Sequence, residues 1–96
     1  LQMFQAMGNA VEKITNKTGL VIATRNTEMA LEVERDDDEM DKLHRQLIST
    51  LVDPNWKHGV EPAIDLTLLG RYYERYADHA VSVSRRVYFL VTGKYA

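Results

Sequence analysis

The 96-residue chain contains no cysteine, which removes disulfide bonds, thiolate metal sites and cysteine nucleophiles together. A small domain without disulfides fits the cytoplasm better than an oxidising compartment. No segment reaches the roughly 18 uninterrupted apolar residues of a membrane span. The most apolar segment, residues 80–91, is interrupted by Arg85 and Arg86. We therefore expect a cytoplasmic protein without membrane insertion.

An excess of basic residues is also missing. Twelve Lys and Arg against 14 Asp and Glu give a net charge of -2 at pH 7. Nucleic-acid binders are normally basic with a basic face, so we expect no nucleic-acid partner. Glycine-rich phosphate-binding loops are absent, and Ser49, Ser82 and Ser84 lack the neighbouring base that marks a nucleophile. These gaps argue against an enzyme.

Apolar residues make up 45% of the chain, which is normal for a globular domain, and 96 residues allow one domain with one modest core. They recur at spacings of three and four in three segments, which predicts amphipathic helices over about residues 1–24, 28–52 and 60–92. Short connections between these segments favour an all-α fold, an antiparallel three-helix bundle. The predicted buried stripes are Leu1, Phe4, Met7, Val11, Ile14, Val21 and Ile22; Met29, Val33, Met40, Leu43, Leu47 and Leu51; and Ile64, Leu66, Leu69, Tyr73, Ala77, Ala80, Val81, Val87 and Leu90.

Turn and cap residues predict where these helices begin and end. Thr27 is a suitable N-cap for the second helix, and residues 53–55 (DPN) form a turn after it. Gly93 is a natural stop for the third helix. Leu1 is not a methionine and already lies in a helical pattern, so we expect a piece of a longer polypeptide.

Two acid pairs with the same spacing lie on the second and third predicted helices. Asp37 and Asp41 form one pair, and Glu74 and Asp78 form the other. Residues four apart on a helix leave the same face one turn apart. Asp37 also takes a position where the apolar stripe would continue. In an antiparallel bundle the two pairs lie at about the same height, so we expect them to form one carboxylate cluster.

Converging carboxylates repel one another unless a cation lies between them. Oxygen ligands favour Mg²⁺, Ca²⁺ or Mn²⁺, or iron if a histidine contributes. The predicted metal ligands are Asp37, Asp41, Glu74 and Asp78. The alternative sources of positive charge are the guanidinium groups of Arg35, Arg71 and Arg75. The sequence does not choose between a metal ion and these groups.

Two histidines lie near the acids. His44 follows Asp41 by three residues, which is half of the Glu-x-x-His signature of di-iron bundles. Asp78 and His79 are adjacent and diverge by about 100° around a helix, so the second half is missing. We interpret His44 as a peripheral ligand and His79 as structural. The alternative functions are a metal-dependent enzyme of the di-iron kind and a plain structural or dimerisation module with solvated acids.

Residues 37–44 (DDEMDKLH) and 69–81 (LGRYYERYADHAV) closely resemble the PhoU family, the bacterial regulators of phosphate uptake and phosphate signalling. Residues 56–61 and 86–93 look like one branch of that family. The similarity spans most of the chain and is weakest over residues 9–24. Two acidic motifs in the right order and at the right separation make it specific.

The resemblance implies one of two tandem three-helix repeats, most like the second, each with acid-x-x-x-acid motifs and, in some members, metal ions on the acidic surface. Asp37 and Asp41 match the motif of the middle helix, and Glu74 and Asp78 match that of the last. The first repeat is missing, so a surface that needs both halves is incomplete here. An exposed apolar flank favours self-association, and we expect a homo-oligomer.

The function that the resemblance implies is a non-enzymatic negative regulator. It would act as a cytoplasmic adaptor between the ATPase subunit of the phosphate-import transporter and a sensor histidine kinase of the phosphate-starvation response. It would keep the kinase quiet when phosphate is plentiful. We expect bound metal to neutralise and rigidify the acidic face, and so to present a defined surface to these partners.

Overall fold

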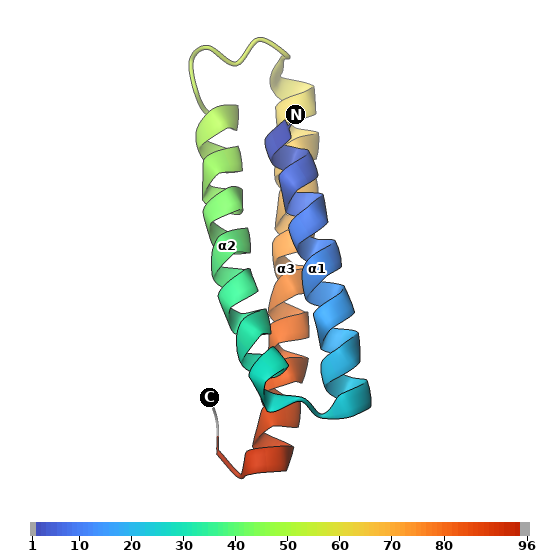
Figure 1. Cartoon of the computed structure of the whole chain (residues 1–96). Coiled ribbons are helices and arrows are strands. Elements are labelled where there is room, and N and C mark those ends of the chain that lie inside the picture. Colours follow the sequence, from blue (N-terminus) through green and yellow to red (C-terminus); the bar gives the residue numbers. More distant parts are fainter. Residues whose placement is uncertain (1, 95–96) are drawn as a thin grey trace.

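The computed structural model describes residues 2–94, which form three helices and no strand. These are α1 (Gln2–Thr24), α2 (Thr27–Leu51) and α3 (Val60–Thr92). Each helix runs antiparallel to the one before it, in one bundle 50 Å long (Figure 1). The predicted antiparallel three-helix bundle is confirmed, and the predicted bounds differ by at most one residue. Leu1, which the prediction placed in the first helix, lies outside the described residues.

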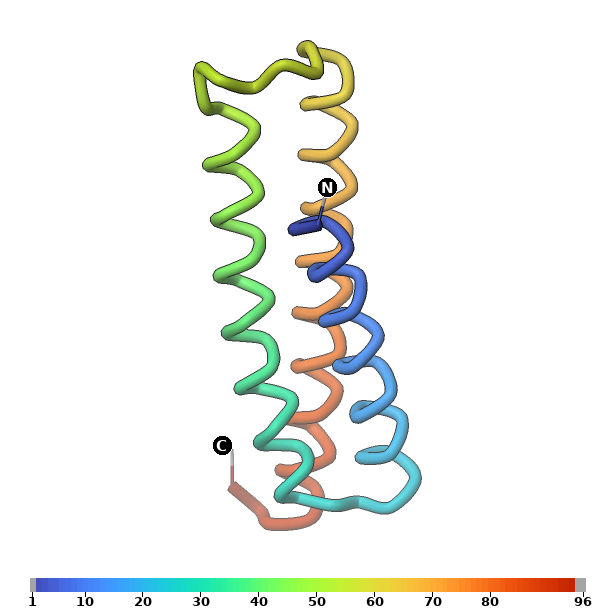
Figure 2. Tube along the Cα trace, turned by 45° about the horizontal axis from the view of Figure 1, so that its top comes forward, coloured from blue at the N-terminus to red at the C-terminus, as the bar shows by residue number. Residues whose placement is uncertain are grey.

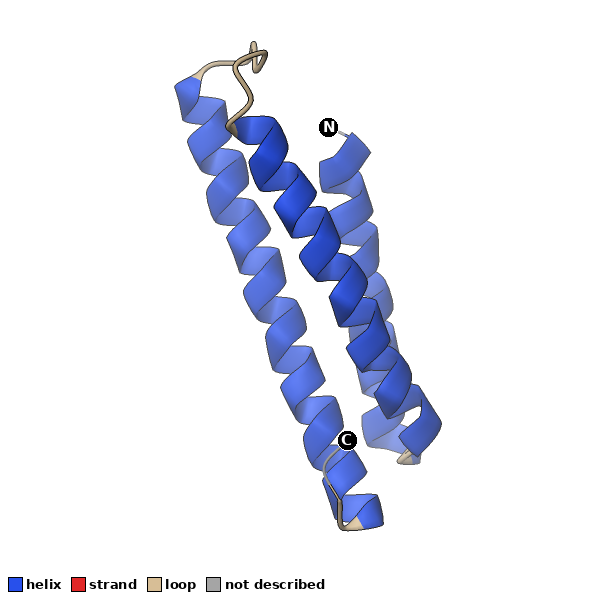
Figure 3. Ribbon diagram, turned by 90° about the vertical axis from the view of Figure 1, so that its left-hand side faces the viewer, coloured by secondary structure: helices blue, strands red, loops and turns tan. Residues whose placement is uncertain are grey.

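The two connections lie at opposite ends of the bundle, so each helix packs lengthwise against both others (Figures 2 and 3). Consequently the middle of α2 lies beside the middle of α3, where the acid pairs are. None of the described helices contains a stretch long and apolar enough to cross a membrane.

The break between α1 and α2 is made by two residues. Arg25 has a left-handed backbone (φ 57°), and its N–H donates to the carbonyl oxygen of Val21 at 2.8 Å. Asn26 is the N-cap of α2, because its side-chain oxygen accepts from the N–H of Met29 at 3.1 Å. The prediction of Thr27 as the cap was wrong by one residue: Thr27 is the first residue of the helix.

The other predicted ends are confirmed. Asp53 accepts the N–H of Asn55 at 2.7 Å in the turn after α2. Gly93 ends α3 in the left-handed region (φ 75°), and its N–H donates to the carbonyl oxygen of Phe89 at 2.7 Å.

The core runs along the axis of the bundle. Its buried apolar side chains are Met7, Ile14, Val21, Ala30, Val33, Met40, Leu47, Leu51, Ala77, Ala80 and Val81. Helix α3 contributes mainly small residues, including the buried Gly70 and Ala77, which lets its backbone approach its neighbours closely.

Four side chains predicted to be buried are instead exposed. Ile64 and Leu90 are 53% and 75% exposed, and each lies about 140° around α3 from the buried Ala77. Leu69 and Ile22 lie on the flanks of their helices and are 42% and 55% exposed. A three-helix bundle covers only the inward side of each helix, so these positions face outward.

Candidate metal centre between α2 and α3

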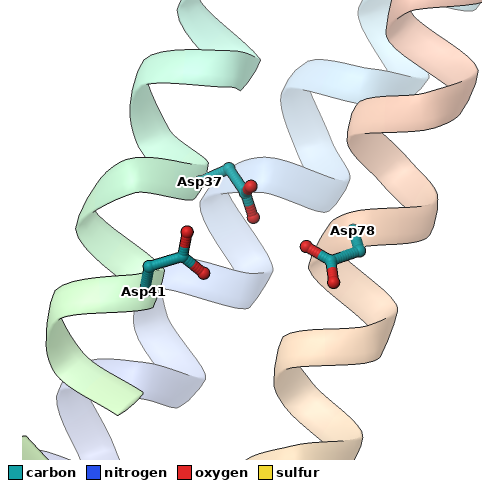
Figure 4. A group of neighbouring side chains, drawn as sticks. All are labelled: Asp37, Asp41 and Asp78. Carbon is teal, nitrogen blue, oxygen red and sulfur yellow. The ribbon is translucent and has the colours of Figure 1, made fainter. Parts of the chain in front are cut away.

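Three of the four predicted ligands meet between α2 and α3. Asp37 and Asp41 on α2 and Asp78 on α3 each offer a carboxylate oxygen, and these oxygens lie within 4.8 Å of one another. Figure 4 shows the three carboxylates turned toward the space between the helices. The spacing of four brings the two α2 aspartates onto one face, and the packing of α3 adds the third. We call these three residues the aspartate group.

Asp37 contributes a buried carboxylate oxygen to the aspartate group. It lies between Val33 and Met40 in the sequence pattern, both of which are fully buried. Its Oδ1 atom is buried and has no hydrogen-bond partner within residues 2–94. A buried carboxylate oxygen without a donor is unfavourable, so this atom is suited to a cation from outside the chain.

The surroundings of Asp37 raise the pKa of its carboxyl from 3.8 to about 6. Burial is the largest cause, and the charges of Asp41, Asp78 and Asp38 add to it. The guanidinium of Arg85 acts in the opposite direction and lowers this pKa. The aspartate group therefore carries repulsion that a bound cation would relieve.

Glu74, the fourth predicted ligand, does not join the aspartate group. Its Oε2 atom pairs with Nδ1 of His44 at 3.0 Å. His44 lies one turn after Asp41, and Glu74 lies one turn before Asp78. Because the helices are antiparallel, these two residues lie at the same level of the bundle. His44 was interpreted as a peripheral ligand, and in the structure its Nδ1 pairs with Glu74. The Nε2 atom of His44 is buried without a hydrogen-bond partner in the described part of the chain.

Arg85 supplies a positive charge that acts on Asp37 of the aspartate group. It lies two turns after Asp78 on the same side of α3 and pairs with Glu34 of α2. The guanidiniums proposed from the sequence, those of Arg35, Arg71 and Arg75, take part in none of the ion pairs found among residues 2–94. Arg85 was not among the guanidiniums proposed as counter-charges, although its spacing of seven from Asp78 was a usable signal.

A surface hollow of about 380 Å³ lies beside Asp37. Its lining residues are Leu31, Glu34, Arg35, Asp37, Asp38, Val81 and Arg85. Asp37 is the member of the aspartate group that lines this hollow. The donor set is made of carboxylate oxygens alone, which suits hard divalent cations.

Comparison with known proteins agrees with the motifs. Residues 4–87 match the family model described as the PhoU domain. The chain is 49% identical over 92 residues to the phosphate-specific transport system accessory protein PhoU homolog 1 of Mycobacterium leprae, covering 96% of this chain and 41% of that protein. It is 47% identical over 92 residues to PhoU homolog 2 of Mycobacterium tuberculosis, covering 96% and 43%.

The chain thus spans about two fifths of the length of these curated relatives. No solved structure matches the chain significantly. Because the family model covers residues 4–87 and the relatives align along 96% of the chain, this protein belongs to the PhoU family.

Proposed function

We propose that this chain is a non-enzymatic regulatory domain of phosphate uptake and phosphate-starvation signalling. The observation that carries the proposal is membership of the PhoU family, whose mycobacterial relatives are named accessory proteins of a phosphate-specific transport system. Since the chain spans about two fifths of those relatives, we propose that it is one three-helix domain of a longer, two-repeat protein.

The aspartate group is the site that we assign to a divalent or iron ion. Three carboxylates within 4.8 Å, a buried Asp37 oxygen without a donor, and a raised pKa of Asp37 all support a missing positive charge. The ion would supply the charge that neutralises these carboxylates. Asp37 and Asp41 would hold it from α2, and Asp78 would hold it from α3.

Glu74 has a structural role and is not a ligand of the ion. Its carboxylate is engaged by His44, so we propose that the pair positions α2 against α3 one turn away from the ion. A hydrogen bond that joins two helices fixes their distance, and with it the spacing of the carboxylates.

Neutralising the aspartate group would also stiffen the outer surface of α2 and α3. We propose that this surface is what the partners recognise: the ATPase subunit of the phosphate-import transporter and a sensor histidine kinase, both on the cytoplasmic side. The chain would act by binding, as an adaptor.

The test is a pull-down of the ATPase subunit and of the kinase with protein purified without chelator, together with its metal content. The test variant is Asp37→Asn/Asp41→Asn/Asp78→Asn, and the control is Glu39→Gln, which alters an exposed acid of the same helix. We expect only the test variant to lose metal and partners. Normal partner capture by a metal-free test variant would overturn the role of the metal. Capture of neither partner by the wild type would overturn the adaptor.

A further inference from the structure

Arg85 of α3 lies near two carboxylates of α2 that are one turn apart. Its Nε atom pairs with Oε1 of Glu34. Asp37 follows Glu34 by three residues, and residues at this spacing are neighbours on the surface of a helix. All three side chains line the same hollow of about 380 Å³, and the charge of Arg85 acts on Asp37. The guanidinium therefore lies one turn of α2 away from the aspartate group.

The side chain of Arg85 is able to change its partner. It is 55% exposed, and its Nε atom is the one that pairs with Glu34. A guanidinium has five N–H donors in a planar fork, so this contact leaves most of them for other acceptors. Exposed side chains rotate between their preferred conformations without movement of the backbone. The carboxylate of Glu34 is thus what fixes the position of the guanidinium.

Asp37 is the second carboxylate that can bind Arg85. Its Oδ1 atom is buried and has no hydrogen-bond partner among residues 2–94. Asp41 and Asp78 place two more carboxylate oxygens within 4.8 Å. A guanidinium binds a carboxylate strongly, through two N–H groups at once. If Arg85 were released from Glu34, the aspartate group would therefore attract it, and the guanidinium would occupy the place of a cation.

Arg35 lines the same hollow but lacks this choice of partner. It precedes Asp37 by two residues, and side chains two apart on a helix do not face each other. It takes part in none of the ion pairs found in the described part of the chain. Arg85 reaches α2 from the neighbouring helix, so it is the guanidinium that lies beside both Glu34 and Asp37.

We propose that Glu34 is a positioning residue, which holds the guanidinium of Arg85 away from the aspartate group and so keeps these carboxylates available to an ion. Without Glu34, Arg85 pairs with Asp37 and competes with the ion. Arg85 is then a cation that the chain itself supplies, and Glu34 decides between it and a metal ion. The competition with an ion rests on the proposed function, whereas the choice of partner by Arg85 does not.

The first test compares Glu34→Gln in two backgrounds by calorimetric titration with Mn²⁺ at pH 7.5. With Arg85 present, Glu34→Gln should weaken Mn²⁺ binding about tenfold. In the Arg85→Gln background the same change should alter the dissociation constant less than about threefold, because no guanidinium is left to move. If Glu34 acted only through its own negative charge, binding would weaken equally in both backgrounds, and this result would overturn the proposal.

Asp38→Asn is the matched control. Asp38 is exposed, lines the same hollow and adds its negative charge to that of Asp37. It takes part in no ion pair found among residues 2–94. The variant therefore removes one charge and releases no guanidinium, so it should weaken Mn²⁺ binding only about two- to threefold. A loss as large as that in Glu34→Gln would overturn the proposal.

The second test needs no metal ion. In chelator at pH 7.5, NMR measures how fast the guanidinium N–H groups of Arg85 exchange with solvent. Glu34→Gln should keep this rate within about threefold of the wild type, because Asp37 replaces Glu34 as the partner. Glu34→Gln/Asp37→Asn leaves neither carboxylate and should exchange about tenfold faster.

Equal exchange rates in these two variants would overturn the change of partner. The two tests also separate this proposal from the proposed function. If the wild type binds no Mn²⁺ while the exchange rates differ as expected, the ion site and the competition for it are overturned, and the choice of partner by Arg85 is supported.

Discussion

Gly70 of α3 lies so close to Leu47 of α2 that a β-carbon at residue 70 would approach Leu47 Cδ2 to 2.6 Å. Leu47 is fully buried, so its side chain has little room to move away. The same β-carbon would meet His44 Cδ2 at 3.5 Å. This glycine therefore sets the distance between the two helices one turn away from Glu74.

The variant Gly70→Ala should be less stable than the wild type by about 1 kcal/mol. Alanine favours a helix over glycine by about 1 kcal/mol, but overpacking a core costs about 1–3 kcal/mol. Urea unfolding measures the difference. The control Gly19→Ala meets nothing within 4 Å and should gain up to about 1 kcal/mol. Equal gains in both variants would contradict the close approach of α2 and α3.

Stability should fall as pH rises through the titration of Asp37. The pKa of this carboxyl is about 6 in the folded chain against an ordinary value of 3.8. Folding therefore favours the protonated form, and the resulting stability is present below pH 4 and lost as pH rises through 6. The full shift corresponds to about 3 kcal/mol, and solvent screening of this half-exposed group reduces it to about 1–2 kcal/mol.

Asp37→Asn removes that unfavourable charge. In chelator it should match the wild type near pH 4 and exceed its free energy of unfolding by about 1–2 kcal/mol at pH 7.5. Urea unfolding at both pH values measures this, with Glu39→Gln as the control for an exposed acid of α2. A variant that is less stable than the wild type at pH 7.5 would mean that Asp37 is not held in a repulsive site.

Arg85 should control the charge of the aspartate group. Its guanidinium lowers the pKa of Asp37, so Arg85→Gln should raise that pKa further, as followed by carboxyl-carbon NMR during a pH titration. The variant should also bind Mn²⁺ more tightly, because a competing positive charge is removed. Arg45→Gln changes an exposed arginine of α2 and serves as the control. A lower pKa of Asp37 in Arg85→Gln would count against this arrangement of charges.

Glu74 and Asp78 should differ in their effects although they share a face of α3. Asp78→Asn removes a carboxylate of the aspartate group and should weaken Mn²⁺ binding at least tenfold. Glu74→Gln removes the carboxylate that pairs with Nδ1 of His44 and should weaken Mn²⁺ binding only a few-fold, through the spacing of the helices. Isothermal titration calorimetry gives both values, and losses of equal size would place Glu74 among the ligands.

Much of the fold follows from the spacing of apolar residues, and the site follows in part. Asp37 could be singled out because an acid interrupts the stripe between Val33 and Met40, and the structure keeps it half-buried. The separation of Glu74 from the aspartates was not predictable from spacing. It depends on which residue of α3 lies beside His44 of α2, and the register of the two packed helices decides this.

The contacts that sequence reasoning missed are all between helices. Gly70 was identified as suited to close packing, but its partner Leu47 is set by the register of α2 against α3. The same register brings Arg85 of α3 to Glu34 of α2, and it lets the charge of Arg85 lower the pKa of Asp37. Ile64 and Leu90 are apolar but exposed. Apolar character alone therefore does not show which side of a helix is covered by the neighbouring helices.

Calorimetric titration of the metal-free chain with Mn²⁺ at pH 7.5 measures whether the aspartate group holds a cation. We expect saturable binding of one ion per chain, at least tenfold weaker in Asp41→Asn and in Asp78→Asn and unchanged in Glu39→Gln. Binding that is absent up to about 10 mM Mn²⁺, or equal in the wild type and both aspartate variants, would contradict it.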